Sequence, residues 1–259
     1  MPYPRNALEA RDEIQQRLEG RQPALFLDYD GTLTPIVARP ELAILPEETR
    51  ALLKELAQRF PVAIVSGRDL ADVRKMVGLD DLVYAGSHGF DIQGPGGLRL
   101  QNEQAKSALP DLDAAESALN ARITDIKDAW VERKHFAIAV HYRQVDETDA
   151  PRVETLVKQV QSQHPALRLK GGKKIWELQA DIEWDKGRAV LWLLEHLGLD
   201  RPNILPIYMG DDVTDEDAFR ALADRGMGIG VGVGEDTAAH YTLRDTDEVA
   251  PFLRMLREA

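Results

Sequence analysis

Carboxylates follow two apolar segments of this 259-residue chain, at the point where each segment ends. Asp28 and Asp30 come after the run ALFL, and Asp211 and Asp212 come after the run ILPIYMG. Carboxylates at such positions can attack phosphorus, transfer a proton or bind a hard cation. They can also do no more than end a strand and begin a turn, since Gly31 follows Asp30 in a turn-forming Asp-Gly-Thr. The other polar residues at strand ends decide between these interpretations.

Two further strand ends carry polar groups of a complementary kind. Ser66-Gly67-Arg68 follows the apolar run VAIV, and Lys186 begins a helical pattern after Asp185. In an open parallel sheet, ligands bind beyond the carboxyl ends of the strands, where these groups would meet. Alone, the Ser-Gly-Arg sequence is equally consistent with an ordinary tight turn. Taken together, a nucleophilic carboxylate, a second carboxylate, a hydroxyl and an ammonium group predict phosphoryl transfer through a covalent aspartyl phosphate.

Each group has a predicted role in that reaction. Asp28 attacks phosphorus, while Asp30 gives a proton to the leaving oxygen and later takes one from water. Lys186 keeps the pKa of Asp28 low and offsets the charge of the phosphate. The residues expected to bind the phosphate group are Asp28, Thr32, Ser66, Gly67 and Lys186.

The same carboxylates predict a Mg²⁺ site. Hard oxygen ligands favour this ion, and we expect it to be bound by Asp28, by Asp211 and by the carbonyl oxygen of Asp30. Asp212 or Asp215 would then orient the water molecules around the metal. The acidic residues that follow have a simpler interpretation as well, because acids stabilise the N-terminus of a helix.

Strand-like and helix-like segments alternate over most of the chain, which is typical of a parallel sheet covered by helices. This pattern predicts a doubly wound, Rossmann-like α/β core. We expect the helix after the last apolar run to have Thr214 as its N-cap and Asp217 in a capping-box position. The expected strands are residues 25–27, 62–65, 82–86 and 204–210, and the expected helices are residues 7–18, 47–60, 69–77 and 186–197.

The alternation changes over residues 104–182, where we expect a smaller inserted α/β domain, with residues 1–103 and 183–259 forming the core. A hairpin-like segment with a Gly-Pro-Gly-Gly turn precedes the insert. Within it, the run FAIAVHYR alternates so that two alanines share one face with His141 and Arg143. Small residues beside hydrogen-bonding ones suit a face that a polar ligand approaches.

The composition limits the class of protein and its partners. The formal net charge of −12 argues against binding to nucleic acid or to an anionic membrane. The chain has no cysteine, which excludes disulfides, thiolate metal sites and cysteine nucleophiles and suits a reducing cytoplasm. No apolar run approaches the length of a membrane span or of a signal-peptide core. We expect a cytoplasmic protein, and we expect it to be a monomer.

Four motifs, DYDGTLTPI, SGR, DKG and GDDVTDEDAF, resemble in this order the signature motifs of the haloacid dehalogenase-like (HAD) phosphatases. More narrowly, FLDYDGTLTPIV, GSHGFDI, VERKHFAIAVHYR, KIWELQ and GDDVTDEDAF resemble trehalose-6-phosphate phosphatases over nearly the whole chain, apart from the first 20 residues. The resemblance implies a HAD core whose inserted domain is a cap that closes over the sugar. It also implies a Mg²⁺-dependent phosphatase acting on trehalose 6-phosphate, with a functional link to trehalose-6-phosphate synthase.

The resemblance implies further that residues of both domains contact the substrate. Paired carboxylate and ammonium groups suit a disaccharide, which presents many hydroxyls. Each candidate has a simpler interpretation, as part of a surface ion pair on a hairpin or as a residue of a turn. The expected contacts are Arg68 and His88 in the core and Glu132, Lys134, His141, Arg143 and Glu177 in the insert.

Two other functions stay open at this point. A phosphatase with the same kind of cap can act on another sugar phosphate, such as sucrose phosphate or mannosyl-3-phosphoglycerate. A catalytically silent subunit can regulate a trehalose-synthesising partner, but it would lack a nucleophile, a lysine or a metal carboxylate, and none of these is missing here. A panel of sugar phosphates separates the two phosphatases.

Overall fold

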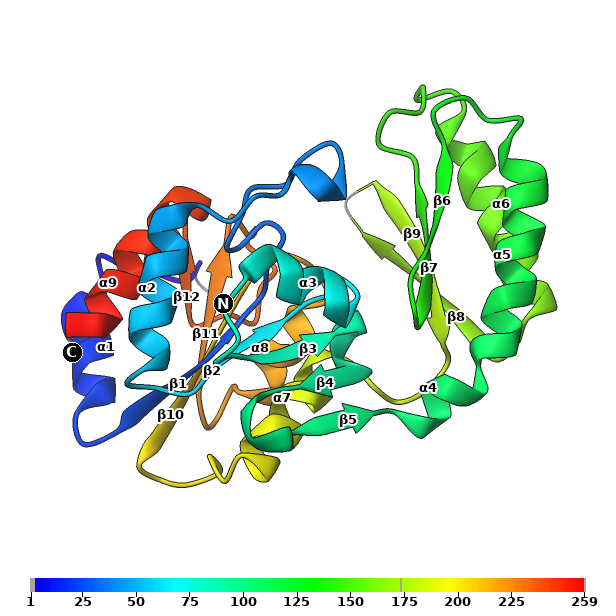
Figure 1. Ribbon diagram of the computed structural model, residues 1–259. Coiled ribbons are helices and arrows are strands. Elements are labelled where there is room, and N and C mark those ends of the chain that lie inside the picture. Colours follow the sequence, from blue (N-terminus) through cyan, green and yellow to red (C-terminus); the bar gives the residue numbers. More distant parts are fainter. Residues whose placement is uncertain (1–2, 173, 259) are drawn as a thin grey trace. The chain divides into compact units, whose positions relative to one another are not determined.

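The computed structural model describes residues 3–172 and 174–258, and the chain divides into two compact units. The first unit, the core, includes the residues up to Arg99 and those from Trp184 onwards. The second unit, the cap, is Leu100–Glu183. Each unit has a sheet of its own (Figure 1). No helix in the described part of the chain is long and apolar enough to cross a membrane.

The core is built on one largely parallel sheet. Among the described residues this sheet has eight strands, in the order β12-β11-β10-β1-β2-β3-β4-β5. The pairings from β12 to β3 are parallel, whereas β4 runs antiparallel to β3. The strands are β1 (Gln22–Leu27), β2 (Val62–Val65), β3 (Val83–Gly86), β4 (Asp91–Gln93), β5 (Arg99–Gln101), β10 (Ile204–Gly210), β11 (Met227–Val231) and β12 (Tyr241–Leu243).

The winding of this sheet reverses at β1. From β1 the chain proceeds through β2 and β3 towards one edge, and later through β10, β11 and β12 towards the other. β1 is therefore flanked by β2 and β10, both parallel to it. The loops that leave β1 and β10 diverge at their carboxyl ends, which is where ligands bind in open parallel sheets. This confirms the doubly wound core predicted from the sequence.

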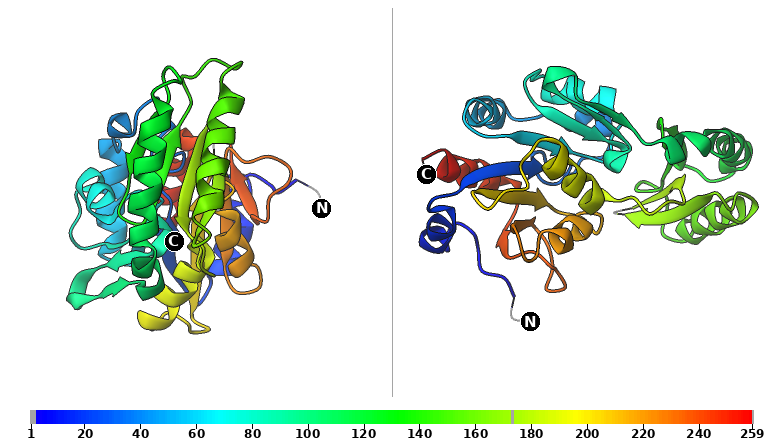
Figure 2. Two further views of the ribbon diagram at one scale, coloured as in Figure 1. Left: turned by 90° about the vertical axis from the view of Figure 1, so that its right-hand side faces the viewer. Right: turned by 90° about the horizontal axis from the view of Figure 1, so that it is seen from below.

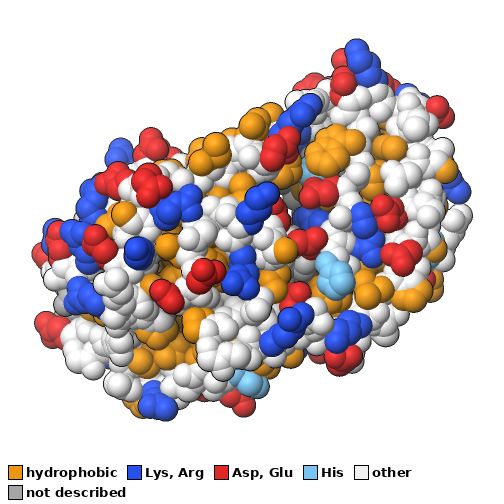
Figure 3. Space-filling model, in the orientation of Figure 1, with side chains coloured by type: hydrophobic (Ala, Val, Ile, Leu, Met, Phe, Trp, Pro, Cys, Tyr) orange, Lys and Arg blue, Asp and Glu red, His pale blue; other side chains and the backbone are white. Residues whose placement is uncertain are grey.

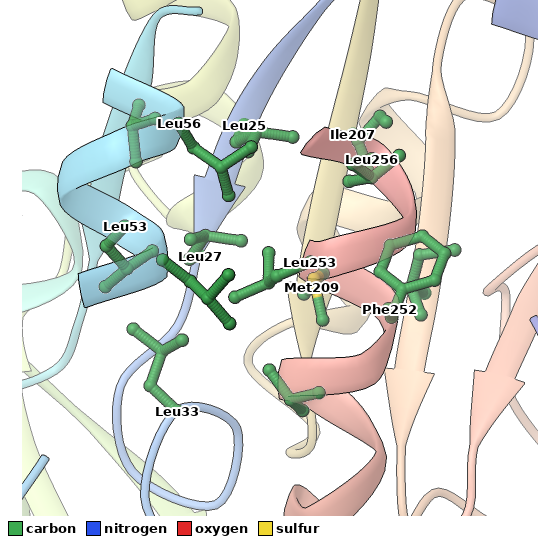
Figure 4. Packing of buried hydrophobic residues seen from close by; sticks show 14 of the residues in the cluster. Leu25, Leu27, Leu33, Leu53, Leu56, Ile207, Met209, Phe252, Leu253 and Leu256 are labelled. Carbon is green, nitrogen blue, oxygen red and sulfur yellow. The ribbon is translucent and has the colours of Figure 1, made fainter. Parts of the chain in front are cut away.

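Helices cover both faces of the core sheet (Figure 2). One hydrophobic cluster joins α1, α2, α3 and α9 to alternate residues of the central strands. Side chains of α2 and α9 there meet Leu25 and Leu27 of β1 (Figure 4). The core helices are α1 (Arg11–Leu18), α2 (Glu47–Ala57), α3 (Leu70–Val77), α7 (Lys186–His196), α8 (Glu216–Ala221) and α9 (Val249–Glu258).

The opposite face of the sheet packs against α7 and α8. Ile207 and Met209 of β10 point into the cluster beneath α2 and α9, so Tyr208 between them points the other way. Its ring meets Phe219 of α8 edge to face, with ring centroids 5.8 Å apart. Residues of β10 thus face both layers, which is why the strand is apolar along its whole length.

The cap has an antiparallel sheet with helices on one face. The strand order is β6-β7-β9-β8. Ile138, Val140 and Leu178 are fully buried towards α5 and α6. The alternate residues form the other face, where Ala139 lies between Glu132 and Glu177. The elements are α4 (Glu103–Ser107), α5 (Leu109–Ile123), β6 (Trp130–Arg133), β7 (Ala137–His141), α6 (Ala150–Gln163), β8 (Leu167–Gly172) and β9 (Ile175–Ala180).

The N-terminal helix is shorter than the sequence predicts, because residues 7–10 form a turn and α1 begins at Arg11. The preceding backbone instead pairs with the edge of the core sheet. Asn6 forms a parallel bridge with Thr242 of β12, and the N–H of Ala7 donates to the Thr242 carbonyl at 2.8 Å. The apolar residues of α1, Ile14 and Leu18, then complete the cluster beneath β11 and β12.

The prediction that Thr214 caps the helix after β10 is wrong. The N-cap residue of α8 is Asp215, and its side chain makes no capping hydrogen bond. The carboxylate of Asp215 accepts hydrogen bonds from groups of the candidate site instead. Asp217, expected in a capping box, pairs with Arg220 at 3.3 Å. The sequence of this loop suggests a helix cap, whereas its N-cap residue, Asp215, serves as a hydrogen-bond acceptor for Lys186 and Tyr208.

Replacing Leu253 with alanine should destabilise the core. The side chain is fully buried between α9 and β1, and truncating such a leucine costs about 2–5 kcal/mol because a cavity remains. Urea unfolding followed by circular dichroism measures the change. Leu42→Ala is the control, since Leu42 is 55% exposed and should change stability by no more than about 0.5 kcal/mol. Equal losses in the two variants would contradict this account of the core.

Candidate active site

The predicted nucleophile, Asp28, lies where the winding of the core sheet reverses. It directly follows β1, and its N–H donates to the carbonyl of Met209 in β10 at 2.9 Å. Asp211 follows β10 at the same edge of the sheet. Both carboxylates are buried, so each needs a partner to be charged.

Lys186 joins two of the buried carboxylates. It is the first residue of α7 and is 3% exposed. Its ammonium donates to Asp28 Oδ1 at 2.7 Å and to Asp215 Oδ1 at 2.6 Å. The Asp185 side chain caps the same helix by accepting from the N–H of Arg188 at 2.8 Å, which fixes the helix end that carries the lysine.

The charges of this cluster do not balance without a further cation. Burial raises the pKa of Asp28, Lys186 lowers it, and the carboxylates of Asp215 and Asp211 raise it again, so the net direction is upward. Burial lowers the pKa of Lys186, but Asp215 and Asp28 raise it by more, so the lysine stays charged. An ionised Asp28 therefore requires more positive charge than one lysine supplies.

The residues present fit a divalent metal ion. Asp28, Asp211 and Asp215 can each offer one carboxylate oxygen, all within 4.8 Å of one another. Oxygen-only ligands of this kind suit a hard divalent cation. Asp212 lies next to the cluster, but its carboxylate accepts from the N–H of Val213 at 2.7 Å. Asp215, expected to orient the water molecules around the metal, lies in the same cluster of carboxylates, and its role there stays a prediction.

Gly31 makes room for one of these carboxylates. Its φ of +87° lies in the left-handed region, and a Cβ built on it would lie 2.1 Å from Oδ2 of Asp211. Any residue with a side chain at position 31 would therefore displace the carboxylate of Asp211. The turn is closed by the N–H of Gly31, which donates to the carbonyl of Thr34 at 2.7 Å. The Asp-Gly-Thr turn thus makes room for the cluster of carboxylates as well as ending a strand.

Asp30, the predicted proton donor, forms a bidentate ion pair with Arg68. Arg68 Nε lies 2.6 Å from Asp30 Oδ2, and its Nη2 lies 2.8 Å from Oδ1. The same guanidinium donates to Asp72, to the carbonyl of Pro40 and to the sulfur of Met76. Burial lowers the pKa of Arg68, but the ion pairs with Asp30 and Asp72 raise it by more. Arg68, predicted as a substrate contact, is in this structure a partner of Asp30.

The remaining predicted phosphate ligands lie on the loops after β1 and β2. The hydroxyl of Ser66 accepts from the N–H of Arg68 at 3.2 Å. Thr32 is fully buried, and its hydroxyl has no partner within residues 3–172 and 174–258. A Cβ on Gly67 would lie 2.8 Å from the ring of His88. His88 adopts φ +57°, which is uncommon for a residue with a side chain. Its backbone N–H donates to the carbonyl of Ser66 at 2.9 Å, so this strained turn is joined directly to the Ser-Gly-Arg loop.

The cap presents two hydrogen-bonded pairs of polar side chains on the face that its helices leave uncovered. Lys134 Nζ lies 2.9 Å from Glu177 Oε2, and the two side chains are 12% and 11% exposed. His141 Nε2 lies 2.7 Å from Glu132 Oε2. Four of the five predicted cap residues are thus brought together in pairs. The fifth, Arg143, is exposed and lies beyond the end of β7.

Two aromatic residues that contact predicted site residues, one in the cap and one in the core, were missed by the sequence analysis. Trp130 stacks on the ring of His141, with centroids 3.8 Å apart and an angle of 7°. Tyr208 donates its hydroxyl hydrogen to Asp215 Oδ1 at 2.6 Å, and burial raises its pKa, so the phenol stays protonated. Neither carries a sequence signal of function, because an aromatic residue in a strand is typical of packing.

Comparison with known proteins identifies the family of this chain. The model of the trehalose-phosphatase family matches residues 26–247. The chain belongs to this family. It is 43% identical to a probable trehalose-phosphate phosphatase D of Arabidopsis thaliana, over 98% of this chain and 72% of that protein. It is 42% identical to trehalose 6-phosphate phosphatase RA3 of Zea mays, over 97% of this chain and 74% of that protein.

Solved structures share the fold of this trehalose-phosphatase family member. A crystal structure described as a trehalose-6-phosphate phosphatase related protein is 27% identical, with a TM-score of 0.79 over 91% of this chain and 97% of that one. The C-terminal domain of a Candida albicans trehalose-6-phosphate phosphatase has a TM-score of 0.82 over 100% of this chain and 99% of that one. At 23% identity, the second comparison supports the fold alone. The core and its inserted α/β unit thus form a fold that is shared with these solved structures.

Gly31→Ala should weaken metal binding by roughly tenfold or more, because the new methyl group displaces one carboxylate ligand of the cluster. Binding of Mn²⁺ followed by electron paramagnetic resonance measures the affinity. Gly96→Ala is the control, since Gly96 also has a positive φ, +69°, but a Cβ there meets nothing within 4 Å. The control separates backbone strain from displacement of Asp211. Unchanged Mn²⁺ affinity in Gly31→Ala would show that Asp211 does not bind the metal.

Proposed function

We propose that this protein hydrolyses trehalose 6-phosphate to trehalose and phosphate in a Mg²⁺-dependent reaction, with a phosphorylated Asp28 as intermediate. The observation that carries the proposal is the buried Asp28, bridged by Lys186 to Asp215 and adjoining Asp211, in a member of the trehalose-phosphatase family. Relatives that share over 40% of its residues are named trehalose-phosphate phosphatases.

The first half of the reaction forms a bond between Asp28 and phosphorus and breaks the bond from phosphorus to the sugar oxygen. Lys186 orients Asp28 and offsets the charge of the phosphate group. Thr32, Ser66 and Gly67 are the proposed ligands of the phosphate oxygens. The buried hydroxyl of Thr32 supports this role, because it makes no hydrogen bond within the described ranges. Bound Mg²⁺, with Asp28, Asp211 and the carbonyl of Asp30 as proposed ligands, would lower the pKa of Asp28 and neutralise phosphate charge.

The proton transfers belong to Asp30. It gives a proton to the sugar oxygen as the bond to phosphorus breaks, and it takes a proton from the water that then attacks the phosphorylated Asp28. The second step releases phosphate and regenerates the free carboxylate. Because Asp30 is paired as a carboxylate with Arg68 at 2.6 and 2.8 Å, it must leave this pair and take up a proton from solvent before it can protonate the sugar oxygen. Arg68 then holds the resting position of the acid.

Local charges have to attract the substrate, because the protein as a whole repels it. The formal net charge is −12. On the face drawn in Figure 3, Lys and Arg side chains are interspersed with Asp and Glu, without a basic field. Lys186 and a bound metal ion would therefore attract the phosphate group, while residues of the cap would contact the sugar. Glu132, Lys134, His141, Arg143 and Glu177 are the proposed sugar contacts in the cap, with His88 as a contact from the core.

Three further expectations belong to this proposal. We propose that the protein acts as a monomer, that it works in the cytoplasm, and that a trehalose-6-phosphate synthase supplies its substrate. The lack of cysteine supports the second. Size-exclusion chromatography with light scattering tests the first.

Phosphate release should depend on both the sugar and the metal. Trehalose 6-phosphate, sucrose 6-phosphate and glucose 6-phosphate are compared side by side, each with Mg²⁺ and with EDTA. We expect release from the first ester to exceed the others and to stop in EDTA. Asp28→Asn should abolish release, because a neutral amide is a poor nucleophile. Preference for another ester would overturn the proposed substrate but not the roles of the core residues, whereas full activity of Asp28→Asn would overturn the mechanism.

Glu177→Gln should raise the KM for trehalose 6-phosphate by about tenfold, because a hydrogen bond to a charged group is worth about 1.5–3 kcal/mol. Hydrolysis of p-nitrophenyl phosphate, which has no sugar, should stay unchanged. Glu154→Gln is the matched control, since Glu154 pairs with Lys158 at 2.6 Å on the outer helix α6 of the cap. If both variants keep the normal KM, Glu177 does not contact the sugar.

A further inference from the structure

Tyr208 occupies an unusual position in the apolar strand β10. Its ring is fully buried and packs edge to face on Phe219 of α8. Its hydroxyl lies 2.6 Å from Oδ1 of Asp215 and donates to it. The ring alone would satisfy the packing, so the hydroxyl needs an explanation of its own. It is directed at the same oxygen that Lys186 contacts at 2.6 Å.

The carboxylate of Asp215 is surrounded by donors on both oxygens. Oδ1 accepts from Lys186 and Tyr208, while Oδ2 accepts from the N–H groups of Asp211 at 3.0 Å and Asp212 at 2.9 Å. A carboxylate offers about four acceptor positions, and four donors are directed at the two oxygens of Asp215. Its position and its rotation are therefore both fixed. The two amides belong to the loop that carries Asp211, so the same carboxylate also orders that loop.

The ammonium group of Lys186 donates hydrogen bonds both to Asp215 and to the proposed nucleophile, Asp28. Its distances to the two carboxylates, 2.6 and 2.7 Å, are nearly equal. Tyr208 supplies part of the hydrogen bonding that Asp215 Oδ1 requires. Without that hydroxyl, Oδ1 of Asp215 would keep Lys186 as its donor, and the carboxylate could shift towards the ammonium group. The ammonium would then move away from Asp28, and the nucleophile would lose the cation that orients it.

We propose that Tyr208 is a positioning residue for phosphoryl transfer, which sets the carboxylate of Asp215 so that Lys186 is presented to Asp28. This inference rests on the proposed phosphatase function, because it assigns to Lys186 the task of orienting the nucleophile. Tyr208 touches neither substrate nor metal in this account. Its effect reaches the reaction through Asp215 and Lys186.

The core contains a matched tyrosine for comparison. Tyr84 lies in β3 of the same sheet and is 1% exposed. Its hydroxyl donates to the carbonyl of Leu79 at 2.6 Å, away from the acidic cluster. Tyr208→Phe and Tyr84→Phe therefore remove the same atom from equally buried rings, with equally short hydrogen bonds. Any loss that comes from removing a buried hydroxyl is common to both variants, whereas only Tyr208 donates to a carboxylate of the acidic cluster.

The experiment measures kcat, KM and thermal unfolding for both variants, on trehalose 6-phosphate and on p-nitrophenyl phosphate with saturating Mg²⁺. Tyr208→Phe should lower kcat on both esters by roughly tenfold, the loss of one hydrogen bond to a charged group, and change KM by less than about twofold. Tyr84→Phe should keep the normal kcat, and the two unfolding temperatures should fall alike. A normal kcat in Tyr208→Phe, or an equal loss in Tyr84→Phe, would overturn the inference.

A double-mutant cycle then tests whether the effect passes through Asp215. In an Asp215→Asn background, Tyr208→Phe should leave the residual rate unchanged within about twofold, because the acceptor that it positions has already been altered. A further tenfold loss in that background would overturn the proposed route. Since p-nitrophenyl phosphate carries no sugar, a protein that hydrolyses it but ignores trehalose 6-phosphate would refute the proposed substrate and still test Tyr208.

Discussion

One ammonium group has to serve two buried carboxylates at the centre of the core. Lys186 lies within 2.7 Å of both Asp28 and Asp215. Buried carboxylates without a cation would become protonated, and a protonated nucleophile does not attack. The lysine is placed by the start of α7, whose N-cap Asp185 fixes the first turn. Its counterions come from β1 and from the loop after β10, so one contact joins three segments that are distant in the sequence.

The backbone around this contact is shaped by close approach. Gly31 has no side chain where the carboxylate of Asp211 lies, and Gly210 has none where that of Asp215 lies, since a Cβ there would be 2.3 Å from the carboxylate carbon. The acidic groups therefore pack against the main chain itself. This arrangement crowds like charges, which a bound cation relieves. Asp30, the proposed acid–base group, is kept separate from them by its pair with Arg68.

The strands and the reactive groups at their ends could be predicted because both follow from local patterns. An apolar run that stops at a carboxylate is visible without knowledge of its neighbours, and the order of the motifs added the family. The pairing of Asp30 with Arg68 was not predictable, because an arginine after a strand has many potential partners. The sequence also suggested Thr214 as a helix cap, whereas the chain uses Asp215 to bind Lys186. Periodicity shows that Tyr208 is buried but not what its hydroxyl meets.

The pairing of Asn6 with Thr242 shows that the folded core begins earlier in the chain than the match to the family model. The match to the family model begins at residue 26, although the relatives align with 97–98% of this chain. The segment before residue 26 covers the outer strand β12 and places Ile14 and Leu18 in the main cluster. A fragment that began at Gln22 would keep every proposed group of the reaction and the whole of β1, and yet it would expose the edge of β12 beside an apolar surface. Exposed edges of this kind promote aggregation, so the folding unit extends further towards the N-terminus than the match to the family model does.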